Sequence, residues 1–320
     1  ETVETSKLAM FMMTATGEKG ADFWMKLYVG IIDFDLFQTL KEAKCSEVNF
    51  WRPSGNTNFK ALSRGEMFLF KLHSPYNCIV GGGFFQAFKL LPTSLAWEAF
   101  GVANGADSCA AMLERIYKYR KTDSIAEPDP EIGCVILSSV FYFDEGDEIP
   151  VPEDWSSKIV QGKLYSRTEP IGAALYEQAQ TRLNKQECRY YQDTLLSPEL
   201  GFGHFKLLVI EAYQRKCAIS GEQAAPVLRV AQIRPSRLGG LKDISNGLLL
   251  RSDYCTLFER GYITVTPDYK VAVSKRVAAD FGENSEYNKI QGCQIALPDN
   301  KEKWPSHAYL EWHNKRVFLG

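Results

Sequence analysis

The run SNGLLLRSDYCTLFERG, residues 245–261, decides how the C-terminal third of this 320-residue chain folds. Its apolar residues 248–250 are typical of a buried strand, and residues 252–260 have helical spacing up to the final glycine. Upstream, residues 227–233 predict another strand, and the Gly239-Gly240 pair predicts a turn between the two strands. The sequence therefore predicts two strands followed by a helix.

Length and composition describe an ordinary globular protein. A chain of 320 residues corresponds to about two domains, and a hydrophobic content of 45% excludes wholesale disorder. The eight cysteines are scattered and form no C-x-x-C pair, which argues against a zinc knuckle and fits a reducing compartment. No stretch is long and apolar enough to span a bilayer. We therefore expect a cytoplasmic protein with no membrane partner.

The net charge of −2 hides an uneven distribution. Residues 205–276 contain twelve Lys/Arg and six Asp/Glu, a balance of +6, which leaves −8 for the rest of the chain. Clustered lysine and arginine supply most of the non-specific affinity of proteins for DNA. A basic face that is simply solvated is the other interpretation.

The C-terminal motifs resemble the HNH endonuclease family, in its restriction-enzyme branch. The resemblance covers about 110 residues and rests on residues 230–235 (VAQIRP), the Gly239-Gly240 pair, residues 245–261 and the closing residues 310–314 (LEWHN). It implies a ββα-metal module in which a histidine activates water, an asparagine holds the loop, and a helix residue binds one divalent ion, Mg²⁺, Mn²⁺ or Zn²⁺. The implied partner is double-stranded DNA, and a double-strand cut by single-metal sites implies a homodimer.

Two of the three implied chemical residues are replaced. Gln232 occupies the position of the base histidine, and an amide cannot take up a proton near neutral pH. Cys255 occupies the position of the metal ligand on the helix, where a thiolate suits zinc better than Mg²⁺. Asn246 is kept. We expect a retained scaffold with impaired or lost cleavage.

A rearranged site is the alternative to lost cleavage. Asp253 is a second candidate metal ligand beside Cys255, and Glu259 or His313 are further candidates for such a site. Contacts to DNA phosphates need not be lost with the chemistry. Four basic residues flank the site and are predicted to bind DNA, although one of them, Arg251, has the alternative of neutralising Asp253: Arg234, Arg237, Lys242 and Arg251.

The N-terminal half contains many short predicted strands and few helices, and its motifs resemble the PUA superfamily. The relevant stretches are residues 28–33, 47–55, 68–73 and 79–83, and the similarity is greatest to EVE-like domains that are fused to HNH modules. The resemblance implies an α+β chain with a small N-terminal PUA-like β-barrel and peripheral helices. Joined to an HNH module, such a domain resembles the reader of a modification-dependent restriction enzyme.

A reader of this kind binds a modified base that is flipped out of the duplex, between aromatic walls and polar contacts. The predicted pocket residues are Asn49, Phe50, Trp51, Lys71 and Trp97, with Arg52 and Ser54 as further polar partners. We also expect the glycines at 81–83 to let the backbone approach the ligand. Core packing is the alternative for Trp97, and phosphate binding or simple solvation for Lys71. An RNA-binding PUA-like protein is the less favoured alternative for the whole chain.

These interpretations give four segments. Residues 1–24 are an extension of unknown role, residues 25–168 the reader domain, residues 169–200 a helical linker, and residues 201–320 the HNH nuclease-like domain.

Overall fold

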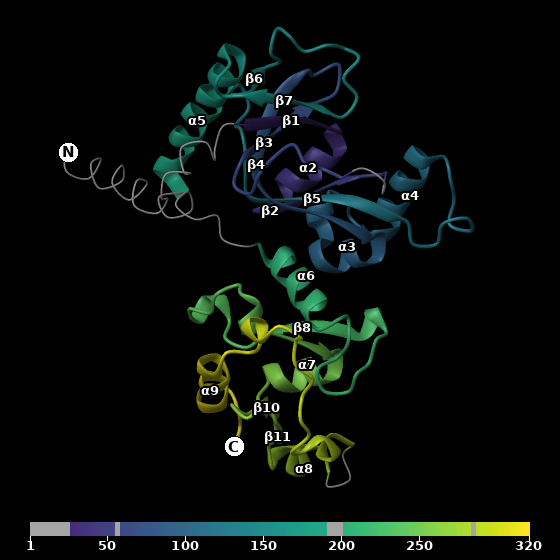
Figure 1. The fold of residues 1–320 in the computed structure, drawn as a ribbon, viewed down its shortest axis with the longest axis vertical. Helices are drawn as coiled ribbons and strands as arrows, with labels where there is room; N and C mark the ends of the chain where they lie inside the picture. Colours follow the sequence, from purple (N-terminus) through teal and green to yellow (C-terminus); the bar gives the residue numbers. More distant parts are fainter. Residues whose placement is uncertain (1–25, 55–57, 191–200, 283–285) are drawn as a thin grey trace, which may run out of the picture. The chain divides into compact units, whose positions relative to one another are not determined.

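The chain divides into two compact units, with the division between Glu199 and Leu200. The computed structural model describes residues 26–54, 58–190, 201–282 and 286–320 (Figure 1). The expected extension at residues 1–24 lies outside the described residues. Within these ranges, no helix combines the length and the apolar character that crossing a membrane would need.

The N-terminal unit is built on one seven-stranded sheet. Its path runs β2-β5-β4-β3-β1-β7, with β6 paired to β4, and only the β1–β3 pair is parallel. The strands are β1 (Lys26–Ile32), β2 (Glu47–Arg52), β3 (Met67–Leu72), β4 (Cys78–Pro92), β5 (Glu131–Tyr142), β6 (Ile149–Pro150) and β7 (Gly162–Ser166).

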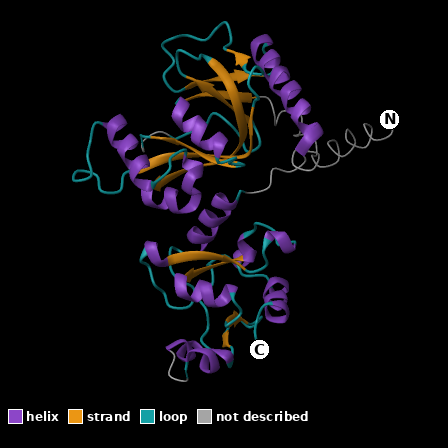
Figure 2. Cartoon of the chain, turned by 180° about the vertical axis from the view of Figure 1, so that it is seen from behind, coloured by secondary structure: helices purple, strands orange, loops and turns teal. Residues whose placement is uncertain are grey.

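The α+β class and the sheet-rich N-terminal half are confirmed (Figure 2). The end strands β2 and β7 are not paired with each other in the described part of the chain, so the sheet is open rather than a closed barrel. The helices of the unit are α2 (Phe34–Glu42), α3 (Thr93–Phe100), α4 (Cys109–Arg120), the 3₁₀ helix η1 (Gly101–Asn104) and α5 (Pro170–Tyr190).

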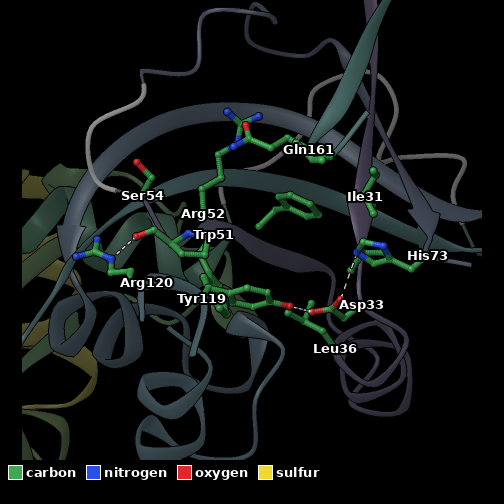
Figure 3. A pocket seen from close by; sticks show the side chains of 14 residues that line it. Ile31, Asp33, Leu36, Trp51, Arg52, Ser54, His73, Tyr119, Arg120 and Gln161 are labelled. Atoms are coloured by element: carbon green, nitrogen blue, oxygen red, sulfur yellow. Dashed lines mark hydrogen bonds and ion pairs between the residues drawn. The ribbon is translucent and has the colours of Figure 1, made fainter. Parts of the chain in front are cut away.

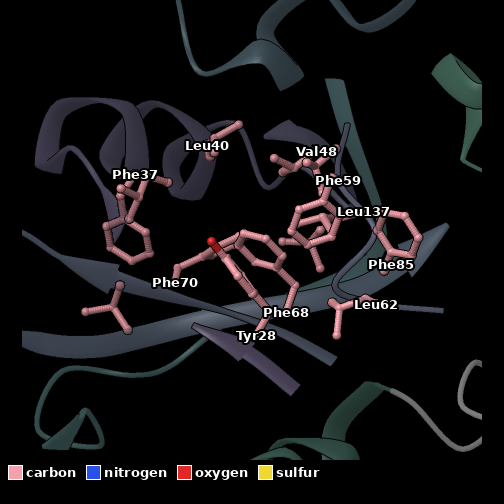
Figure 4. Packing of buried hydrophobic residues seen from close by; sticks show 14 of the residues in the cluster. Tyr28, Phe37, Leu40, Val48, Phe59, Leu62, Phe68, Phe70, Phe85 and Leu137 are labelled. Atoms are coloured by element: carbon pink, nitrogen blue, oxygen red, sulfur yellow. The ribbon is translucent and has the colours of Figure 1, made fainter. Parts of the chain in front are cut away.

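Strand β3 sorts its side chains onto the two faces of the sheet. Phe68 and Phe70 enter one buried cluster with Phe37 and Leu40 of α2, whereas Leu69 enters the other (Figure 4). This alternation follows from the two-residue period of a strand. Both faces are covered, which explains why β3 is an apolar run interrupted only by Lys71.

Helix α5 belongs to the N-terminal unit, which corrects its expected role as a linker. Its residues Leu175, Ala179 and Leu183 are buried in the second cluster, together with Leu69 of β3. The spacing of four residues places these side chains on one helical face. Burial of that face gives α5 a structural role against the sheet.

The glycines at 81–83 serve strand packing, which differs from the expected ligand contact. A Cβ atom at Gly81 would collide with the carbonyl oxygen of Phe141, and one at Gly82 with that of Phe68. The register between β4 and β5 also shifts just after Gly82. The glycines therefore allow β4 to lie close to its two neighbouring strands.

The C-terminal unit contains the expected strand-strand-helix order. β8 (Leu228–Gln232) and β9 (Gly247–Arg251) are antiparallel with Gln232 opposite Gly247, and α7 (Ser252–Glu259) follows directly. The other elements are α6 (Phe202–Ala212), η2 (Ala225–Val227), η3 (Ser236–Leu238), η4 (Ile244–Asn246), β10 (Ile263–Val265), β11 (Val271–Val273), α8 (Arg276–Phe281), η5 (Glu286–Ile290), η6 (Lys301–Lys303) and α9 (His307–Arg316).

We predict that Phe68→Ala destabilises the N-terminal unit by roughly 3–5 kcal/mol, because it removes a fully buried ring. The ring of Phe68 lies 4.7 Å from that of Phe50 and 5.2 Å from that of Tyr28. Guanidinium denaturation read by hydrogen-exchange mass spectrometry should show earlier opening of peptides from the N-terminal unit and not of those from the C-terminal unit. The exposed Ile125→Ala should change stability by less than about 0.5 kcal/mol. An unchanged midpoint for Phe68→Ala would contradict this packing.

Candidate functional site

The loop between β8 and β9 is held by the buried side chain of Asn246. Its Oδ1 accepts the backbone N–H of Arg234 at 2.8 Å, and its Nδ2 donates to the carbonyl oxygens of Arg234 at 2.9 Å and Leu241 at 2.8 Å. The amide thus uses its acceptor and both donor hydrogens. Asn246 therefore ties both ends of the loop together.

Gln232 is used as a second tie on the same loop. Its Nε2 donates to Ser236 Oγ at 3.0 Å and to the carbonyl oxygen of Leu241 at 3.4 Å, while its Oε1 accepts the backbone N–H of Ser236 at 3.1 Å. An amide in this position can donate and accept hydrogen bonds but cannot remove a proton from water. The position can support the loop and cannot serve as a general base.

Cys255 is buried on α7. Its Sγ donates to Glu259 Oε1 at 3.6 Å, and Glu259 Oε2 in turn lies 4.0 Å from Arg229 Nη2. Burial, and then the charge of Glu259, raise the pKa of the Cys255 thiol to about 12. The thiol is therefore protonated near neutral pH, and only the thiolate is a good metal ligand.

Asp253 does not complete a metal site. Its carboxylate accepts two hydrogen bonds of 2.7 Å from Nε and Nη2 of Arg251, and these bonds hold its pKa below the usual range. Throughout the described ranges, no three or more His, Cys, Asp or Glu side chains gather where they could hold a metal ion. The residues at this position do not fit the divalent ion that HNH enzymes use, so no chemical step is assigned to one.

His313 is a structural histidine rather than a replacement base. It is buried, its Nδ1 lies 2.8 Å from Thr264 Oγ1, and its Nε2 lies 3.1 Å from the carbonyl oxygen of Phe258. Because a carbonyl only accepts, Nε2 carries the proton and Nδ1 accepts from the threonine hydroxyl. The ring also stacks on that of Phe258 at 3.7 Å, and burial lowers its pKa to about 4.

The four predicted DNA contacts divide into two groups. Arg234 donates through Nε to the carbonyl oxygen of Leu238 at 2.6 Å, and Arg251 is paired with Asp253, so both side chains take part in structure. Arg237 is exposed, and Lys242 is partly exposed on the same loop. A cavity of about 350 Å³ lies beside this loop and is lined by residues that include Gln232, Arg237, Glu259 and His313.

A larger cavity of about 470 Å³ lies in the N-terminal unit (Figure 3). It is lined from the end of β1, from α2, from β2, from the end of α4 and from the segment before β7. The predicted residues Phe50 and Trp51 line it, as do Arg52 and Ser54. Aromatic surface beside a few polar groups is the usual composition of a small-molecule site.

Three predicted pocket residues do not line this cavity. Asn49 is fully buried and donates to Asn104 Oδ1 at 2.8 Å, so it serves the packing of β2 against η1. Lys71 is buried and donates to the carbonyl oxygen of Leu72 at 2.8 Å and to Asn77 Oδ1 at 3.0 Å. Trp97 lies half-buried on α3.

The cavity contains a carboxylate that the motifs did not identify as a site residue. Tyr119 Oη donates a hydrogen bond to Asp33 Oδ2, and His73 Nε2 lies 3.4 Å from Asp33 Oδ1 (Figure 3). Burial, and then this hydrogen bond, raise the pKa of Tyr119 to about 12, so its proton stays on the phenol. Gln161 is a fourth lining residue. Asp33 ends the motif stretch 28–33, where nothing marks it as a site residue, and it forms no side-chain capping bond at the start of α2.

Comparison with known proteins identifies the C-terminal module. Residues 217–266 match the family model described as HNH endonuclease. The resemblance inferred from the motifs is confirmed for this segment. We refer to residues 217–266 as the HNH domain.

Among solved structures, the chain is similar to ASCH from Zymomonas mobilis, with a TM-score of 0.34 and 9% identity over 47% of this chain and 94% of that chain. A mutant form of that protein gives the same TM-score and identity. The modification dependent TagI restriction endonuclease is similar with a TM-score of 0.29 and 11% identity, over 85% of this chain and 75% of that chain. No curated protein matches the sequence of this chain.

We predict that the stability of the C-terminal unit falls as the pH drops from 6.5 towards 4. The pKa of His313 is about 4 when folded and 6.5 when unfolded, so the unfolded chain binds the proton first, at a cost of roughly 3 kcal/mol. Protonation of Asp253 lowers the stability only below the ordinary pKa of an aspartate, 3.8. Urea denaturation across this pH range should give a flatter pH dependence for His313→Gln, and an unchanged one for the exposed His307→Gln. Equal slopes in both variants would contradict a buried neutral His313.

Proposed function

We propose that this chain recognises double-stranded DNA carrying a modified base, and that its HNH domain holds the DNA without cutting it. The family match of residues 217–266 supports a nuclease ancestry and therefore a DNA partner. The positive balance of residues 205–276 supports contact with phosphates. Arg237 and Lys242 are the residues proposed to make that contact.

One observation carries the proposed loss of cleavage. The two positions that the motif resemblance assigns to the base and the metal ligand of HNH enzymes hold an amide bonded to its own loop and a protonated, buried thiol. Neither group can generate a hydroxide nucleophile near neutral pH. Asn246 nevertheless keeps the loop closed, so the scaffold and the chemistry are separable.

The cavity of the N-terminal unit supports the modified-base part of the proposal. A volume of about 470 Å³ accommodates a single nucleobase, and Phe50 and Trp51 offer it aromatic surface. Asp33 offers an acceptor to the amino edge of a base, and Arg52 offers a donor to a phosphate. Methylcytosine and hydroxymethylcytosine are the ligand classes to test first.

Cleavage by a rearranged site is the second candidate function. Glu259 lines the cavity beside the loop and carries the remaining carboxylate near Gln232, so it is the residue on which such a site would depend. Asp253 is already hydrogen-bonded to Arg251. His313 is already hydrogen-bonded to Thr264 and to the backbone of Phe258.

A nicking assay separates the two functions. We expect the unaltered chain to bind modified plasmid but to leave it supercoiled with Mg²⁺, Mn²⁺ or Zn²⁺. The Gln232→His/Cys255→His variant restores the implied base and ligand and should produce nicked circles at a measurable rate. The matched control is Gln232→Ala/Cys255→Ala, which should cut no more than the unaltered chain. Nicking by the unaltered chain that Glu259→Gln abolishes would overturn the proposal in favour of the rearranged site.

A second experiment tests the pocket. Val160 lines the cavity and is 79% exposed, so Val160→Trp should fill the cavity without disturbing the core. We expect the preference for hydroxymethylated over plain duplex to fall by at least about tenfold, or roughly 1.4 kcal/mol. Ile125→Trp, at a 90% exposed position outside the cavity, should leave the preference unchanged. Equal binding of modified and plain duplex by the unaltered chain would refute the reader function, and preferential binding of RNA would favour the RNA-binding alternative.

A further inference from the structure

Two large apolar side chains project from the loop of the HNH domain. Leu241 is 65% exposed and Leu238 is 48% exposed. Both lie in a loop whose residues 233–242 include three basic and no acidic side chains. Isolated surface leucines are ordinary, but this pair lies beside the cavity lined by Gln232 and Arg237.

The backbone at both leucines is held by side chains of the same loop and by one side chain of α9. The carbonyl oxygen of Leu241 accepts from Asn246 Nδ2 at 2.8 Å, and its N–H donates to Tyr309 Oη on α9 at 3.4 Å. The carbonyl oxygen of Leu238 accepts from Arg234 Nε at 2.6 Å. These backbone groups of the two leucines are thus hydrogen-bonded within the unit, whereas their apolar side chains are exposed to water.

The two glycines between the leucines make this arrangement possible. Gly239 has φ +83°, in the left-handed region that favours glycine, and a Cβ atom at Gly240 would collide with the carbonyl oxygen of Arg234. The leucines are therefore presented on a tight, rigid turn. Little conformational entropy of the backbone remains to be lost when they are buried against a partner.

We propose that Leu241, with Leu238 beside it, is a wedge that inserts between two base pairs of duplex DNA from the minor groove. Apolar wedges of this kind partly unstack a base step and bend the duplex, and the cost is offset by added contact with the bent DNA. Arg237 and Lys242 lie on either side of the wedge residues along the loop and would contact the adjacent phosphates. DNA is the favoured occupant because the whole loop between β8 and β9, residues 233–246, has three basic side chains and one acidic side chain, Asp243.

The wedge rests on the proposed DNA binding and is tested separately from it. Plain duplexes carrying 2-aminopurine at successive steps are titrated with the full chain, so that no modified base engages the N-terminal pocket. We expect the fluorescence of one step to rise several-fold on binding, since unstacking relieves its quenching. The Leu241→Ala variant should abolish that rise and weaken binding on the order of tenfold.

Two variants keep the test interpretable. Leu241→Met keeps an apolar side chain of similar volume and should retain the signal. Val227→Ala, at an exposed site in the same unit but outside the loop, should bind as the unaltered chain does. The signal should also persist in Val160→Trp, which separates it from base flipping into the pocket. Circular dichroism confirms that each variant is folded.

The possible results distinguish a failure of the proposed function from a failure of the wedge proposal. Absence of any duplex binding by the unaltered chain would refute the proposed function. Binding in which Leu241→Ala keeps the full fluorescence rise would overturn the wedge alone. If sedimentation shows instead that Leu241→Ala dissociates a dimer and leaves the fluorescence unchanged, the leucines cover a contact between two copies and the wedge is wrong.

Discussion

The side-chain amide of Asn246 is the constraint on which the functional surface of the C-terminal unit depends. Asn246 bonds to Arg234, which lies 12 residues earlier near the start of the loop, and to Leu241, which lies 5 residues earlier. A buried amide with one acceptor and two donor hydrogens engaged is strongly favoured over any arrangement that leaves one of them unpaired. The bonds from Gln232 to Ser236 and the turn at Gly239 lie within the segment that these hydrogen bonds of Asn246 close.

Under the proposed function, the same constraint lets the HNH fold keep its shape while its chemical residues change. The pairing of β8 with β9 uses backbone groups, and the closure of the loop uses Asn246, so neither requires a histidine at 232 or 255. Gln232 forms three further hydrogen bonds within the loop. Cys255 places a small buried thiol next to Glu259. Both side chains fit the scaffold, and under the proposed function they stand where hydrolysis would need a base and a metal ligand.

Sequence periodicity predicted much of the fold because burial imposes it locally. Residues 245–261 gave the strand and helix of the HNH domain within a residue or two, and the apolar run of β3 was plain. The residues of an apolar helical face do not indicate which other element will cover that face. The helical spacing in α5 was visible, but its burial against the sheet through Leu175 depends on strands more than a hundred residues earlier, so α5 was mistaken for a linker.

The residues of the candidate sites likewise differ in whether a local sequence pattern could predict them. Phe50, Trp51 and Arg52 were predicted because they adjoin a loop signal at the end of one strand. Asp33 and Tyr119 are 86 residues apart and meet only because the end of β1 and the end of α4 converge on one cavity. No local sequence pattern indicates that these two ends meet, so the sequence does not identify Asp33 as a pocket residue.

The uneven charge of the chain bears on how two weak sites can give selective binding. A loop with few phosphate contacts binds any duplex weakly, and a pocket for one flipped base must first meet the cost of unstacking it. On one chain, binding at either site raises the effective concentration of DNA at the other, so modest affinities multiply without new contacts. The acidic balance of −8 outside residues 205–276 opposes indiscriminate coating of DNA. Under the proposed function, selectivity rests on the pocket, while the HNH loop supplies general affinity for the duplex.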